Sequence, residues 1–185
     1  MNNFLSALWA ETLKARRSKV PLFTTLGFLI LPLVSGLFMI ILKDPERAKD
    51  LGIISVKAQL VGGVADWPSF FGMLKMGIGI VGLILFAIIT AWVFGREFSD
   101  HTVKELLALP TTRRTIVSAK FVLVFLWLMG LALFIIVIAL GIGAAIDIPG
   151  WSPSLAWLSF WSLLLIAFLT VMLMPVVAWI ASGGR

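Results

Sequence analysis

Long apolar runs, separated by short charged segments, dominate the pattern of hydrophobic and polar positions along this chain. Residues 20–42, 76–95 and 121–146 contain no charged residue, and a fourth uncharged stretch, 148–184, is longer than one membrane span needs. About 20 apolar residues in a helix cross the hydrocarbon core, because a helix satisfies its own backbone polar groups. The pattern therefore predicts four spanning helices, the last at about 154–175, in an all-α polytopic transmembrane helix bundle.

The composition agrees with a membrane protein. With 61% hydrophobic residues and a mean hydropathy of +1.09, the chain is far more apolar than soluble domains. No small-residue cleavage site follows the first apolar run, which at 23 residues is a retained span and not a signal peptide. The absence of cysteine excludes disulfides and thiolate metal sites. The net charge of +6 is concentrated at span ends, which favours the lipid bilayer as a partner over nucleic acid.

Lysine and arginine are distributed unevenly between the two sides of the predicted bundle. One side carries ten: Lys14, Arg16, Arg17, Lys19, Arg96, Lys104, Arg113, Arg114, Lys120 and Arg185. The other side carries five, partly offset by acids: Lys43, Arg47, Lys49, Lys57 and Lys75. Cytoplasmic loops are enriched in these residues. The N-terminus, the 96–120 loop and the C-terminus are therefore expected in the cytoplasm, in a cell membrane of the bacterial inner or plasma type.

Residues 3–19 predict an amphipathic helix with a basic end. Its apolar positions are Phe4, Leu5, Leu8, Trp9 and Leu13. Such a helix lies in the membrane interface before the chain turns into the bilayer. An ordinary positively charged anchor with no further role fits the same residues.

The segment between the first two predicted spans carries its own helix signals. Asp44, Pro45 and Glu46 resemble a helix start, and the predicted helix runs to about Gln59 before two glycines interrupt it. Three aromatic residues then lead the chain back to the membrane, and we interpret them as part of an interfacial aromatic belt. They are Trp67, Phe70 and Phe71.

Small residues and prolines within the spans have structural interpretations. Residues 77–82, GIGIVG, match the dinucleotide-binding pattern G-x-G-x-x-G, but no strand precedes them, so the match is attributed to chance. Close helix approach is the expected role of a second set of small residues, at i, i+4 and i+8. These are Ala87, Ala91 and Gly95. Pro32 and Pro175 each remove a helical hydrogen bond and are expected to kink their helices.

None of the predicted spans contains an acidic, basic or histidine side chain. Proton relays, ion-coupled transport and voltage sensing use such groups at membrane depth, so the chain lacks the usual residues for these mechanisms. The single histidine, His101, lies beside Asp100 and Glu97, with no second histidine or cysteine to complete a metal site. A solvated loop histidine is the simpler interpretation. No catalytic residue, metal or cofactor is expected.

The 96–120 loop predicts two helices. Thr102 begins a capping-box pattern, with Ser99 or Asp100 as a competing cap, and Val103, Leu106, Leu107 and Pro110 share one face. Pro110 ends the first helix, and Thr111 or Thr112 caps the second, which continues through Arg113 and Arg114 into the third span. Arginines in a first turn oppose the helix dipole, so lipid phosphates or acids of a partner protein are expected to compensate them. A solvated loop is the alternative.

At this point the chain resembles a known family. Residues 97–110, EFSDHTVKELLALP, followed by Thr112-Arg113 and Ala119-Lys120, resemble the cytoplasmic loop of exporter-type (type-2) ABC-transporter permease subunits of the bacitracin-resistance-like branch. Residues 9–11 and 14–18 are similar to the N-terminal elbow helix of that family, and 44–60 and 65–71 to its first outer loop.

The resemblance implies a permease subunit that pairs with a second copy, and an ABC ATPase on a separate polypeptide. It implies ATPase-coupling residues in the loop: Glu97, Asp100, Thr102, Leu106, Leu107, Pro110, Arg113 and Arg114. It implies an interfacial elbow formed by Trp9, Glu11, Lys14, Arg16 and Arg17. Such subunits commonly have six spans, so the single transmembrane domain at 1–185 is expected to be a truncated form that lacks the fifth and sixth.

Two other classes of protein fit the same sequence. One is a membrane anchor or scaffold without transport activity, and the other is a small pore-forming protein. A neighbouring reading frame carrying G-x-x-x-x-G-K-[ST] would favour the permease, because that loop binds nucleotide phosphate and is absent from this chain.

Overall fold

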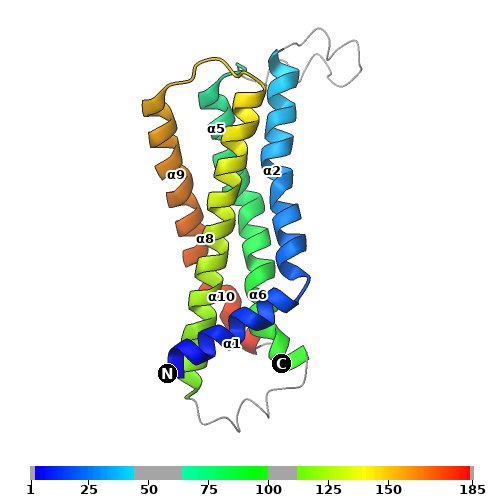
Figure 1. Cartoon of the computed structure of the whole chain (residues 1–185), viewed down its shortest axis with the longest axis vertical. Helices are drawn as coiled ribbons and strands as arrows, with labels where there is room; N and C mark the ends of the chain where they lie inside the picture. The colour runs from blue at the N-terminus through cyan, green and yellow to red at the C-terminus, as the bar shows by residue number, and fades with distance from the viewer. Residues whose placement is uncertain (1–2, 44–63, 100–111, 184–185) are drawn as a thin grey trace.

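The computed structural model describes residues 3–43, 64–99 and 112–183. Every regular element in these residues is helical. In chain order the elements are α1 (Asn3–Arg17), α2 (Val20–Lys43), α5 (Trp67–Gly77), η1 (Ile78–Gly82), α6 (Leu83–Ser99), α8 (Arg113–Ala145), α9 (Pro153–Met172) and α10 (Met174–Gly183). Figure 1 shows the long helices side by side, with α1 lying across one end of the bundle. We call this end the α1 end and the opposite one, where α5 begins, the α5 end. The predicted all-α bundle is confirmed.

Four helical segments are long and apolar enough to cross a membrane. They are Val20–Lys43, Trp67–Arg96, Arg113–Ala145 and Pro153–Gly183. The second and third begin before the uncharged runs do, so Lys75 and Lys120 lie inside helices. Hydropathy marks the uncharged core of a span, whereas the helix begins where a side chain caps it. Asp66 and Thr112 provide these caps.

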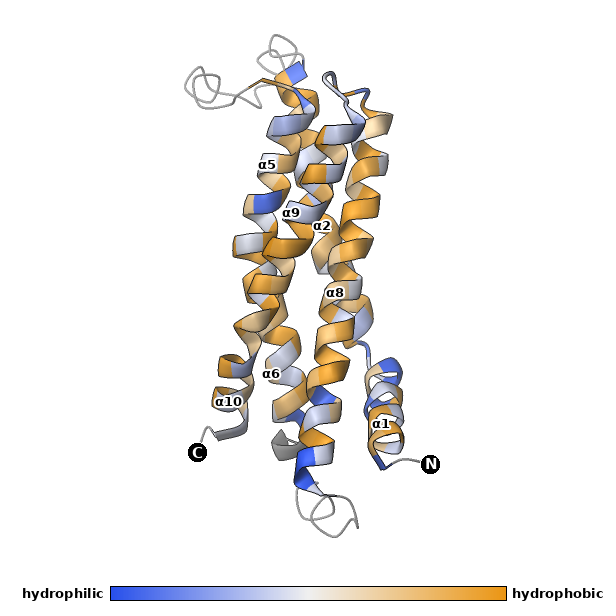
Figure 2. Cartoon of the chain, turned by 90° about the vertical axis from the view of Figure 1, so that its left-hand side faces the viewer, coloured by the Kyte–Doolittle hydropathy of each residue, from blue (hydrophilic) through white to orange (hydrophobic). Residues whose placement is uncertain are grey.

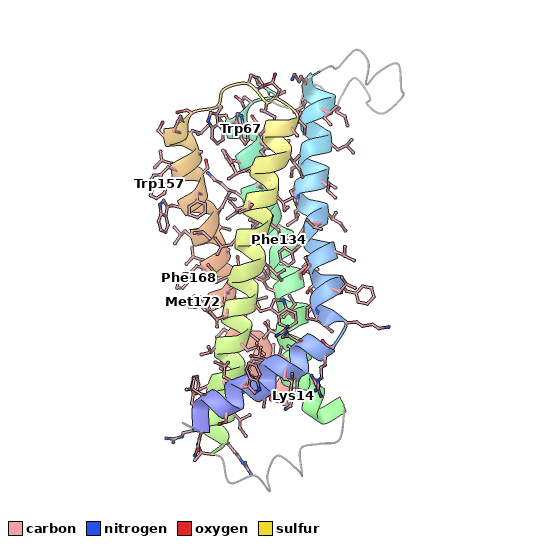
Figure 3. All side chains as sticks on the ribbon, in the orientation of Figure 1. Lys14, Trp67, Phe134, Trp157, Phe168 and Met172 are labelled. Atoms are coloured by element: carbon pink, nitrogen blue, oxygen red, sulfur yellow. The ribbon has the colours of Figure 1, made fainter. Side chains whose placement is uncertain are left out.

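Large apolar side chains cover the outside of the bundle. On α2, Leu22 and Phe23 are 61% and 64% exposed. Figure 3 shows Trp157, Phe168 and Met172 along α9, and all three are exposed. In Figure 2 the apolar colour extends along the helices, and the polar colour gathers toward their ends. A lipid environment accounts for this distribution, since lipid chains solvate apolar side chains that water does not.

The aromatic residues at the start of α5 face the protein interior. Asp66 accepts a hydrogen bond from the Ser69 backbone N–H at 2.9 Å, which starts the helix at Trp67. Trp67, Phe70 and Phe71 are almost fully buried, and the Trp67 ring packs directly on Gly143 of α8. The interpretation of these rings as an interfacial belt was therefore wrong: they form the core of the α5 end. The helix predicted at 44–59 lies outside the described residues.

The glycine-rich run in the second span forms a π-helical turn. In η1 (Ile78–Gly82) the helix widens, and Gly77 just before it lies so close to α2 that an added Cβ would be 2.9 Å from the Leu31 side chain. Further along, α6 packs on α10, and a Cβ added to Gly95 would be 3.9 Å from the Ala181 carbonyl oxygen. Gly77 thus allows a close helix contact, whereas a Cβ at Gly95 would make only an ordinary van der Waals contact.

A break at Leu173 explains the length of the fourth apolar run. The helix α9 ends at Met172, and α10 begins at Met174 with Pro175 in its first turn. Proline has no N–H to continue the helical ladder, so the predicted kink at this residue is present as a break. Pro32, in contrast, lies buried inside the continuous helix α2.

Candidate functional site

Three elements meet at the α1 end of the bundle. The helix α6 ends at Ser99, α8 begins at Arg113, and α1 packs against α8 and crosses the same end (Figure 1). The described helix ends that flank residues 100–111 therefore both lie at the α1 end. This is the end of the bundle where the sequence places the candidate loop.

The start of α8 is built by local capping. Thr112 has extended backbone angles, and its side chain accepts a hydrogen bond from the Thr115 backbone N–H at 3.4 Å, while the two hydroxyls lie 2.8 Å apart. The predicted cap is confirmed at Thr112, the second of the two threonines proposed. Arg113 and Arg114 follow in the first helical turn, and both are exposed. This helix end thus presents two guanidinium groups beside the loop.

A buried lysine joins α8 to α6 near the loop. Lys120 is only 2% exposed, and its Nζ donates a hydrogen bond to the Val93 carbonyl oxygen at 3.1 Å. The ammonium also lies 5.6 Å from the centre of the Phe94 ring, and that ring packs against Phe121 at 4.8 Å. A hydrogen bond and a cation–π contact therefore hold the two helices together at this point.

The sequence pattern placed Lys120 among the charges of the loop and in the family resemblance, but did not predict its burial. One feature of the sequence could have indicated the burial of Lys120. This lysine lies directly before the apolar run that begins at Phe121, and one helical turn after Ile116, which is also buried. A lysine at helical spacing from core residues can bury its long stem while its ammonium finds a carbonyl.

The predicted N-terminal helix is present as α1, and it has distinct inner and outer faces. Glu11 and Ala15 are buried, whereas Trp9, Arg16 and Arg17 are exposed. Lys14, labelled in Figure 3, donates to the Glu11 carboxylate at 2.6 Å. The helix ends where the Ser18 hydroxyl donates to the Ala15 carbonyl at 2.7 Å, and the chain then turns into α2.

The remaining loop residues predicted to couple to a partner stay predictions. Glu97 belongs to α6, near its end, and the structure does not describe its side chain. Outside the described residues lie Asp100, Thr102, Leu106, Leu107 and Pro110. Within the described segments, no group of three or more histidine, cysteine or acidic residues could hold a metal ion.

Comparison with known proteins gives a family match over nearly the whole chain. A family model described as ABC-2 family transporter protein matches residues 7–183. A stretch of 50 residues is also 36% identical to the bacitracin transport permease protein BCRB of Bacillus licheniformis. This stretch is 27% of the chain and spans only 24% of that relative. No solved structure matches significantly.

Proposed function

Since the chain belongs to the ABC-2 family of transporter proteins, we propose that it is the membrane-spanning permease subunit of an exporter driven by ATP. In this proposal a separate ABC ATPase subunit binds to the loop at 96–120 and supplies the energy. The α1 end then faces the cytoplasm, and two permease subunits form the complete transporter. The match to the bacitracin permease covers a quarter of that protein, so it supports the role of permease and not a particular substrate.

One observation carries the proposal. The described ends of α6 and α8 flank the loop at the α1 end, and Lys120 ties the two helices together close to it. A force applied to the loop by a partner would therefore reach two spans at once, instead of being lost in a loosely attached connector. Packed helices that move as units are the ordinary carriers of such a change.

The sequence supplies the surface on which the partner would bind. Leu106 and Leu107 share an apolar helix face, which is the pattern that docks into a hydrophobic groove. Glu97 near the end of α6 and the exposed Arg113 and Arg114 at the start of α8 would orient the partner. Leucines in the groove would carry most of the affinity, and the flanking charges would set association rate and direction.

Co-purification tests this proposal directly. The tagged chain is isolated from its native membranes in mild detergent. Bound polypeptides carrying G-x-x-x-x-G-K-[ST] are then identified by mass spectrometry and by ATP hydrolysis. We expect Leu107→Asp to abolish recovery of the ATPase, because truncating a buried interface anchor costs about 2 kcal/mol or more. Glu97→Ala is expected to reduce coupled hydrolysis with a smaller effect on recovery.

The control is Val64→Asp, which puts the same charge on an apolar residue that is 69% exposed at the α5 end. At matched expression, the Val64→Asp variant is expected to co-purify with as much ATPase as the wild-type chain does. If Leu107→Asp also retains wild-type recovery, the loop does not bind the ATPase and the proposal is wrong.

A further inference from the structure

A basic hollow lies at the corner where α1 turns into α2. Its volume is about 370 Å³, within the range of ligand pockets, about 300–1,000 Å³. Side chains from the end of α1, the turn that follows it and the end of α6 line it: Leu13, Lys14, Arg17, Ser18, Trp92 and Arg96. Arg96 is the first residue of the loop at 96–120, and none of the residues expected to couple to the ATPase lines the hollow.

Two arginines and one lysine line this hollow. Lys14 is paired with the buried Glu11 carboxylate, so its charge is largely compensated. Arg17, from the last turn of α1, is exposed, and Arg96 enters from α6 with its guanidinium 5.3 Å from the centre of the Trp92 ring. Guanidinium groups from two different helices thus border one space. Their fork of N–H donors matches the oxygens of a phosphate group.

The depth of the hollow indicates what kind of phosphate it would meet. Arg96 is the last residue of the second membrane-spanning segment, so the hollow lies at the boundary between apolar and polar surroundings. Trp92 suits this level, since tryptophan is enriched at membrane interfaces. Just beyond Ser18, Leu22 and Phe23 are 61% and 64% exposed on α2. The start of α2, a few residues along the chain from the hollow, thus offers exposed apolar side chains that acyl chains can cover.

The outer face of α1 is also apolar. Leu5, Trp9 and Leu13 are 54%, 66% and 37% exposed, and all three lie on the side of the helix away from the buried Glu11 and Ala15. A soluble anion would use the arginines alone, whereas a lipid would use both the arginines and the apolar faces beside them. The surroundings thus favour a lipid.

We propose that this hollow binds the phosphate of an anionic phospholipid, with Arg17 and Arg96 as its donors and the start of α2 as the seat of its acyl chains. The site is distinct from the proposed ATPase-binding surface, because it uses none of the residues expected to couple to the ATPase. It would fix α1 against the membrane surface at the point where the chain enters the bilayer.

A single cysteine tests the site, because the chain has none of its own. Ser18→Cys places a thiol in the hollow, and Ser182→Cys places one on an exposed site of α10 at the same end. Each variant is placed in nanodiscs of phosphatidylcholine or of an equimolar mixture with phosphatidylglycerol, and its reaction rate with an uncharged maleimide is measured. We expect phosphatidylglycerol to slow labelling at position 18 and not at position 182.

Two neighbouring arginines supply the matched control. Arg17 lines the hollow, whereas Arg16 is also exposed on the same helix and does not line it. In the Ser18→Cys background, we measure the phosphatidylglycerol content that halves the labelling rate of the thiol. Arg17→Gln is expected to raise this content about fivefold, because it removes the attraction of one basic residue for anionic lipid. Arg16→Gln is expected to change it less than twofold. Arg96→Gln is expected to match Arg17→Gln.

Each of three results would overturn the proposal. An equal loss of protection by phosphatidylglycerol in Arg16→Gln and Arg17→Gln would show a general effect of surface charge without a specific site. Full protection by inorganic phosphate in phosphatidylcholine nanodiscs would show a site for free anions. Protection that requires an added ATPase subunit and not phosphatidylglycerol would assign the hollow to a protein partner. Arg17 is exposed, so its variant tests the site even if Arg96→Gln disturbs folding.

Discussion

Replacing Gly143 by alanine tests the packing of the aromatic core at the α5 end. The Trp67 ring lies directly on Gly143, and a Cβ added there would overlap its Cη2 and Cζ3 atoms. Trp67 is only 3% exposed, so its ring cannot move outward into lipid without vacating the core. If Trp67 were an interfacial residue, as its sequence position suggests, the same substitution would meet no obstacle.

Two opposing effects set the size of the change. An extra carbon in a filled core costs about 1–3 kcal/mol, and replacing a helical glycine by alanine returns roughly 0.5–1 kcal/mol. Near the middle of both ranges, the expected net loss is about 1–2 kcal/mol. For a chain of this size each kcal/mol shifts the Tm by about 2–4 °C, so Gly143→Ala is expected to lower it by roughly 2–8 °C.

Thermal unfolding in detergent, followed by tryptophan fluorescence, measures this shift. Gly141→Ala is the control, because it lies in the same helix and an added Cβ meets nothing within 4 Å. Its Tm is expected to stay the same or rise. Trp67→Phe removes the overlapping ring, so the double variant is expected to lose less stability than the two single variants together. A Tm for Gly143→Ala equal to that of Gly141→Ala would refute the packing.

The membrane orientation, the source of ATP hydrolysis and the buried Lys120 can each be tested. An impermeant thiol reagent applied outside the cell is expected to label Val64→Cys and not Ser182→Cys, since these exposed residues lie at opposite ends; the reverse result would put the α1 end outside. The purified chain is expected not to hydrolyse ATP, because its sequence has no G-x-x-x-x-G-K-[ST] motif, and turnover that persists after every other polypeptide is removed would contradict this. Lys120→Met keeps the buried stem but loses the hydrogen bond to Val93, so it is expected to lower the free energy of unfolding by about 1.5–3 kcal/mol. Lys75→Met, at a half-buried position, is the control and is expected to lower the free energy of unfolding much less.

Local signals predicted the parts of the fold that depend on local chemistry. Hydropathy identified the spans because a membrane helix must be apolar over its whole length. Thr112 was recognisable as a cap and Pro175 as a kink, which the structure shows as a break, because each acts on backbone groups within one helical turn. The basic end of the N-terminal helix was visible for the same reason.

Contacts between distant segments could not be predicted in this way. Nothing in the neighbourhood of Lys43 indicates that its ammonium donates to the carbonyls of Ile146 and Asp147, more than a hundred residues away. The bond from Lys120 to Val93 likewise depends on how α6 and α8 pack. The roles of Leu106 and Leu107 remain predictions, because they concern a surface for a second protein.

The π-helical turn η1 sets the rotation of one half of the second span relative to the other. Leu74, Ile78, Gly82 and Phe86 are all buried, at intervals of four residues. In a regular α-helix each such step overshoots a full turn by about 40°, so three steps would carry the buried stripe about 120° around the axis. A π turn holds more residues than an α turn and absorbs part of this drift. Deleting one residue there would instead rotate α6 by about 100° relative to α5. The π-helical turn in this glycine-rich run thus determines which side of α6 faces Lys120.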